Sequence, residues 1–179
     1  MDQQINQIIN QHHRMNRRLW MAILSGVLLI IAVTVLFHFS DVFTHPIVEE
    51  ASTLNDIMFV IIVVVVLAIL AVKRRLMDTK KILSKANITL LSDGQGESTK
   101  DPTNRKAEIL QNAIQFMRQN FLIIWVLGEV VVIIGFILYI LLLNFEAFLI
   151  YSIVGLWSLA VNYPRLQFLQ RLYYLIEEN

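Results

Sequence analysis

The chain contains no cysteine. Without cysteine it can form no disulfide, no thiolate metal site and no iron–sulfur cluster, and it has no Cys nucleophile. The HExxH, GxSxG and GxxxxGK[ST] patterns are also absent, so zinc proteases, serine hydrolases and P-loop nucleotidases find no support. We therefore expect a protein that is not an enzyme and that holds no cofactor.

Charged residues are nearly missing from four long apolar segments. Hydrophobic residues make up 56% of the chain, against about 45–50% in soluble domains. The apolar runs cover residues 19–37, 57–72, 121–143 and 145–163. A bilayer core of ~30 Å needs about 20 helical residues. The sequence thus predicts an all-α fold, a bundle of four transmembrane helices, with spans one and two within residues 19–72 and spans three and four within residues 121–163.

Lys and Arg residues are absent from the two connections that join span one to two and span three to four. All fifteen precede the first run, lie between the second and third, or follow the fourth. Because cationic side chains resist translocation, both termini and the central connection are expected on the cytoplasmic side of a bacterial inner membrane. There the basic residues would contact anionic lipid headgroups, and we expect no nucleic-acid partner.

The segments outside the apolar runs have patterns of their own. Residues 1–18 carry an apolar stripe at helical spacing, and residues 164–179 carry another, so both are expected to form amphipathic helices at the membrane interface. Residues 38–56 form the outer loop. Residues 73–120 are predicted to form a long cytoplasmic helical hairpin, continuous with spans two and three, with a flexible tip at residues 92–99.

One ionisable side chain, Glu129, lies deep in the third span. It follows Phe121 by eight positions, or about 12 Å at 1.5 Å per residue. A charge at such depth costs at least ~2.5 kcal/mol and normally faces protein or a cavity, and low dielectric favours the protonated form. Matching depths on the first and fourth spans places small and polar residues near it, namely Ser25, Gly26, Gly155, Ser158 and Asn162. The second span, which offers only Val and Ile at this depth, is expected to face lipid or another subunit.

Two roles for this polar cluster stay open. In the structural interpretation, neutral Glu129 hydrogen-bonds to a neighbour and determines which helices pair, as expected for a small subunit, scaffold or assembly factor with a protein partner or a homo-oligomeric state. In the transport interpretation, Glu129 takes up and releases a proton or cation, as in a coupled transporter or channel component.

The outer loop offers candidate metal ligands. His38, Asp41 and His45 would share one face if the first helix continued past Phe37, and would resemble a two-His, one-carboxylate site. The alternative is an acidic outer loop that topology keeps free of Lys and Arg. We expect no metal ion here, because the loop is short and nothing in the sequence shows that the helix continues.

Residues 124–136, IWVLGEVVVIIGF, resemble the carboxylate-bearing helix of rotary-ATPase proteolipids (subunit c). In that family a membrane Glu is commonly followed six residues later by Gly, as Glu129 is by Gly135. The resemblance implies an ion-binding carboxylate at Glu129 in a ring-forming hairpin. The second span, however, lacks the glycine stripe of the proteolipid's first helix. The whole layout is similar to small, uncharacterised four-helix bacterial membrane proteins, which implies no particular activity.

Overall fold

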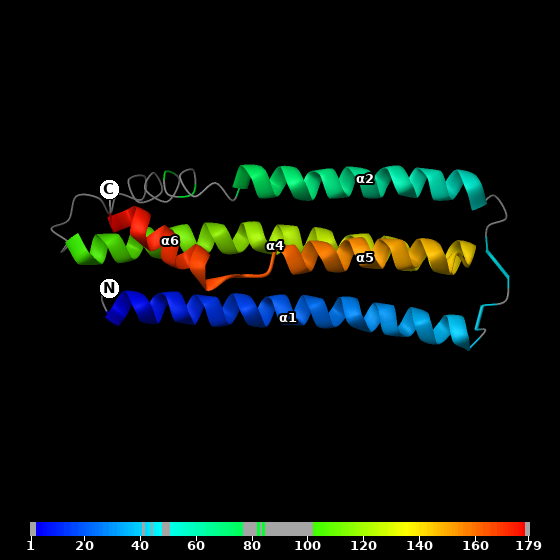
Figure 1. The fold of residues 1–179 in the computed structure, drawn as a ribbon, viewed down its shortest axis with the longest axis horizontal. Coiled ribbons are helices and arrows are strands. Elements are labelled where there is room, and N and C mark those ends of the chain that lie inside the picture. Colours follow the sequence, from blue (N-terminus) through cyan, green and yellow to red (C-terminus); the bar gives the residue numbers. More distant parts are fainter. Residues whose placement is uncertain are drawn as a thin grey trace. The chain divides into compact units, whose positions relative to one another are not determined.

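The computed structural model of the chain is built from long helices (Figure 1). It describes residues 3–40, 42–43, 45–47, 51–76, 82, 84 and 102–177. The helices are α1 (Gln3–Phe39), α2 (Ala51–Leu76), α4 (Pro102–Leu142), α5 (Phe145–Val161) and α6 (Leu166–Glu177). No strand occurs among the described residues. The prediction of an all-helical fold is confirmed.

Three helices contain a stretch long and apolar enough to cross a membrane, and these stretches lie in Ile5–Phe39, Thr53–Arg74 and Lys106–Leu142. Helices α5 and α6 meet the same criterion only as a pair, bent by 40° at the break between them. The described helices therefore indicate a multi-pass membrane protein with three candidate spans, or four if the bent pair counts as one. The fourth crossing and the side of each terminus stay predictions.

The chain divides into two compact units. Unit 1 comprises Met1–Leu19, Val72–Leu122 and Pro164–Asn179, and unit 2 comprises Trp20–Ala71 and Ile123–Tyr163. This division follows the charge pattern, because the sequence segments of unit 1 carry all fifteen Lys and Arg residues. Unit 2 contains nearly all of the apolar runs. The boundaries therefore fall where the basic segments meet the apolar ones.

In unit 1, the apolar stripe of the N-terminal segment is covered by protein. Ile5 and Ile9 are only 4% and 2% exposed. Helices α4 and α6 also contribute buried apolar residues to unit 1. These are Leu110, Ala113, Ile114, Met117 and Phe121 on α4 and Leu169, Leu172, Tyr173 and Ile176 on α6. These side chains form the core of unit 1.

Helix α1 differs from the sequence prediction in one respect. A separate interfacial helix was expected over residues 1–18, but α1 is continuous from Gln3 to Phe39. The reason is local, because no Pro or Gly precedes Gly26 to interrupt the helix. At the other end of the chain, α6 is a separate helix that follows Pro164, and its position at a membrane interface stays a prediction.

The apolar stretch of α4 is more buried than the stretches of α1 and α2. Protein covers 44% of its apolar stretch, against 11% for the stretches of α1 and α2. One core cluster consists of Ile62 from α2, Val131 and Leu138 from α4, and Ala147 and Tyr151 from α5. Most of the remaining α2 surface is exposed, including Phe59, Val60, Val63, Val64 and Leu67. Helix α2 thus presents a wide apolar face, as expected for lipid or subunit contact.

Helices α4 and α5 are joined by the short turn at Leu143 and Asn144. Leu143 has a left-handed backbone with φ of 54°, and its N–H donates to the carbonyl of Tyr139 at 2.8 Å. The side chain of Asn144 then caps α5 by accepting a hydrogen bond from Ala147 N–H. The turn therefore ends one helix and begins the next without intervening loop.

The predicted cytoplasmic hairpin is described only in part. Helix α4 begins at Pro102, because proline is favoured at the first position of a helix, and it continues without a break into the third span. The tip at residues 92–99 and most of the first arm lie outside the described residues. Pairing of two arms therefore stays a prediction.

Candidate intramembrane polar site

Glu129 lies on α4 in unit 2 and reaches α1 at Gly26. A Cβ atom at position 26 would lie 3.2 Å from Oε1 of Glu129. The glycine therefore leaves room for the carboxyl beside the α1 backbone. Glu129 is partly exposed, and among the described residues it has no hydrogen-bond partner.

Immediately before Glu129, α4 makes a close backbone contact with α5. A Cβ atom at Gly155 would lie 2.8 Å from the carbonyl oxygen of Gly128 and would overlap the side chain of Val132. A Cβ atom at Gly128 would in turn lie 3.3 Å from Oγ of Ser158. Glycine at position 155 thus permits an approach that any larger residue would prevent, whereas a larger residue at position 128 would require Ser158 to shift.

Asn162 caps the C-terminal end of α5. Within the described residues, its side chain and backbone carbonyl form hydrogen bonds with Ser158 and Trp125 rather than with the carboxyl of Glu129. Its Nδ2 donates to the carbonyl of Ser158 at 2.7 Å, and its backbone carbonyl accepts from Nε1 of Trp125 at 2.9 Å. Trp125 is fully buried and lies one helical turn before Glu129. The end of α5 is therefore bound to α4 close to the polar site.

A second tryptophan binds α1 to the same end of α5. Nε1 of Trp20 donates to the carbonyl of Leu159 at 3.1 Å, and the Trp20 ring meets the Tyr163 ring edge to face at 5.0 Å. The sequence interpretation did not single out Trp20. Its place at the start of an apolar run, directly after basic residues, is the signal that could have identified it.

The two serines of the predicted cluster differ. Ser158 is buried beside Gly128, and its Oγ has no hydrogen-bond partner in the described part of the chain. Ser25 is exposed, and its hydroxyl donates to the carbonyl of Met21 in its own helix at 2.8 Å. Successive helix residues point about 100° apart. With Gly26 facing α4, Ser25 points away, so it does not join the Glu129 site.

The structure shows no metal site at the candidate ligands of the outer loop, as far as they lie within the described residues. The imidazole of His38 stacks on the ring of Phe145, with centroids 4.1 Å apart and planes 3° apart. His45 is exposed, and Asp41 lies outside the described residues. Within the described ranges, no group of three or more His, Cys, Asp or Glu side chains could hold a metal ion.

The site offers one carboxyl rather than an acid–base pair. Glu129 lies thirteen residues before the end of α4 at Leu142, or about 20 Å along the helix axis. Glu146, in the first turn of α5, follows that end. Catalysis by a carboxylate pair needs both groups at one place. The arrangement can bind a proton or connect helices, but it does not provide a paired acid and base.

Comparison with known proteins gives no relative from which to transfer a role. No protein family, no curated protein and no solved structure matches this chain. The likeness of residues 124–136 to rotary-ATPase proteolipids remains a local resemblance.

Proposed function

We propose that this protein is a non-enzymatic integral protein of a bacterial inner membrane, which acts as a small subunit, scaffold or assembly factor of a membrane complex. One observation carries the proposal. The polar groups inside unit 2 are used in contacts between helices, as in the pairs Glu129 with Gly26, Ser158 with Gly128, and Trp125 with Asn162. Side chains used in this way define how helices pair.

The exposed face of α2 supports a partner-binding role. Apolar side chains such as Val60, Val64 and Leu67 are each about 60% exposed (60%, 59% and 59%). Among the α2 side chains that the structure describes, Ile62 and Ile69 are buried. In a bilayer this face can contact acyl chains or a helix of another subunit. A protein partner or a second copy of the chain would pack there.

In the proposed topology the chain crosses four times, with both termini and the central connection in the cytoplasm. Helix α5 has 17 residues, about 26 Å in length, which is slightly less than the ~30 Å bilayer core. Asn162 and Tyr163 would complete the crossing. The Lys and Arg distribution supports this orientation.

A second candidate is a proton- or cation-coupled transporter or channel component. The observation that favours it is the Glu129 carboxyl, which is partly exposed and has no hydrogen bond among the described residues. An intramembrane carboxyl of this kind can bind and release a proton.

Replacement of Glu129 distinguishes the two functions. The full-length protein and Glu129→Gln would be reconstituted in liposomes, and proton flux would be followed with a trapped pH-sensitive dye. For a scaffold, both proteins give the flux of protein-free liposomes. For a transporter, the unmodified protein gives flux above that level, and Glu129→Gln abolishes it without lowering the melting temperature. Glu146→Gln, at an exposed acid of α5, is the matched control.

A further inference from the structure

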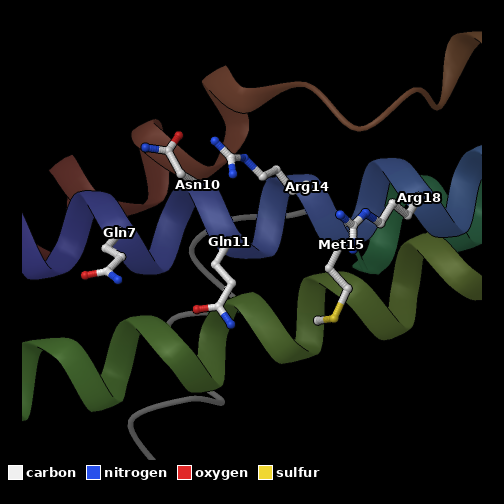
Figure 2. A pocket seen from close by; sticks show the side chains of 6 residues that line it. All are labelled: Gln7, Asn10, Gln11, Arg14, Met15 and Arg18. Atoms are coloured by element: carbon white, nitrogen blue, oxygen red, sulfur yellow. The ribbon is translucent and has the colours of Figure 1, made fainter.

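Helix α1 carries a second polar site, in unit 1. A cavity of about 700 Å³ is lined by Gln7, Asn10, Gln11, Arg14, Met15 and Arg18. Figure 2 shows these side chains on one broad face of α1, with Gln11 and Met15 at the edge nearer α4 and Asn10 and Arg14 at the other edge of that face. Three- and four-residue spacings produce this shared face. None of these lining residues is acidic.

The lining groups match a phosphate anion. Arg14 and Arg18 are four residues apart and exposed, so their guanidinium groups can approach one ligand from adjacent turns. Guanidinium forks bind phosphate oxygens through paired, charge-assisted hydrogen bonds. The carboxamides of Gln7, Asn10 and Gln11 add uncharged donors, and they can also accept hydrogen bonds from hydroxyl groups.

The continuation of the same helix face identifies the source of the phosphate. One turn after Arg18 the face becomes mostly apolar and stays exposed, with Met21, Ala22, Ser25, Leu28, Leu29 and Leu36. The hydroxyl of Ser25 is satisfied within the helix, so it does not interrupt an acyl-chain surface. Val27 and Thr34, which point the other way, are buried. A soluble phosphate compound would use the cavity but not this adjoining face.

We propose that the Gln7–Arg18 face of α1 is a binding site for an anionic glycerophospholipid. The phosphate lies between Arg14 and Arg18, polar headgroup oxygens contact the carboxamides, and the acyl chains follow the exposed face beyond Met21. Such a lipid sets the depth of α1 in the membrane. The site does not depend on the scaffold role, because it requires only that the apolar part of α1 lies in the bilayer.

The test measures lipid binding to the purified full-length protein by native mass spectrometry, with phosphatidylglycerol and phosphatidylcholine of identical acyl chains. We expect at least about tenfold tighter binding of phosphatidylglycerol, corresponding to about 1.4 kcal/mol. The double variant Arg14→Gln/Arg18→Gln should lose this preference. The matched control is Arg17→Gln/Arg165→Gln, which removes the same charge from exposed positions of unit 1 outside the cavity. Equal losses in the two double variants overturn the site.

Two further measurements exclude simpler explanations. Asn10→Leu/Gln11→Leu leaves the charge unchanged and should weaken phosphatidylglycerol binding about three- to tenfold by removing hydrogen bonds. Unchanged binding would mean diffuse electrostatic attraction and would overturn the proposal. Inorganic phosphate should not displace the lipid better than chloride at equal ionic strength. Displacement by phosphate would identify a soluble ligand and would refute the lipid assignment. Circular dichroism verifies that each variant remains folded.

Discussion

The indole of Trp125 donates a 2.9 Å hydrogen bond to the backbone carbonyl of Asn162, thirty-seven residues away in the sequence. The bond joins α4 to the last turn of α5, where the helix carbonyls have no partner within the helix. Trp125 is completely buried, so water cannot replace the bond. This contact therefore determines where α5 ends against α4.

Trp125→Phe should lower the free energy of unfolding by about 1–3 kcal/mol, because the buried carbonyl of Asn162 loses its donor. The measurement is thermal or denaturant unfolding of the purified protein in detergent. Trp157→Phe is the matched control, since Trp157 is 57% exposed, and its effect should stay within about 0.5 kcal/mol. Equal effects of the two substitutions would show that the indole bond contributes nothing specific.

The glycines of unit 2 should differ in their tolerance of alanine. Gly155→Ala puts a methyl group against Val132 and the Gly128 carbonyl, so we expect a loss of about 1–3 kcal/mol from overpacking. Gly26→Ala meets only the end of the Glu129 side chain, which can move. Here the better helix propensity of Ala offsets the contact, and stability should change little.

A double-mutant cycle between Gly26→Ala and Glu129→Ala, which removes the side-chain atoms that a Cβ at position 26 would meet, adds a direct test of that contact. Coupling of about 0.5 kcal/mol or more is expected for residues that touch. Additive effects, or a Gly26→Ala variant less stable than Gly155→Ala, would contradict the geometry.

The sequence predicted those features of the fold that depend on helical rise and on hydrophobicity. The apolar runs became α1, α2, α4 and α5, and depth matching placed Gly26 near the carboxyl against which it lies. Comparing the depths of residues in the membrane does not show from which side of a helix a side chain projects. For that reason the same comparison also selected Ser25, which points away from Glu129. Similarly, the stripe of Ile5 and Ile9 has the same pattern whether lipid or protein covers it. Only the structure shows that the core of unit 1 covers it.

His12 should make stability depend on pH. Burial first, and the positive charge of Arg118 second, lower the pKa of His12 below its ordinary value of 6.5. Its buried Nδ1 has no hydrogen-bond partner among the described residues. As the pH falls below 6.5, the unfolded chain binds a proton that the folded protein binds only at lower pH. The free energy of unfolding should therefore decrease on acidification through this window and be unaffected by His12 above it.

Unfolding midpoints measured between about pH 7.5 and pH 5 would reveal this dependence, since an unperturbed His titrates near 6.5. His12→Gln should reduce the slope. Arg118→Gln removes the second cause and should reduce the slope in part. If His12→Gln and the unmodified protein have the same slope, the histidine does not contribute to the pH dependence.

The absence of cysteine makes the proposed topology accessible to single-cysteine labelling, because an introduced thiol is the only one in the chain. Thr53→Cys, Ser84→Cys and Arg165→Cys use exposed positions near the start of α2, after α2 and after α5. In intact spheroplasts a membrane-impermeant maleimide should label only Thr53→Cys, since Lys and Arg keep their segments in the cytoplasm. All three should react after permeabilisation. Labelling of Arg165→Cys in intact spheroplasts, with Ser84→Cys protected, would reduce the crossings to three and place the C-terminus outside. In that case Arg165 and Arg171 would have been translocated, and the orientation argument would fail at the end of the chain that carries the fewest cationic residues.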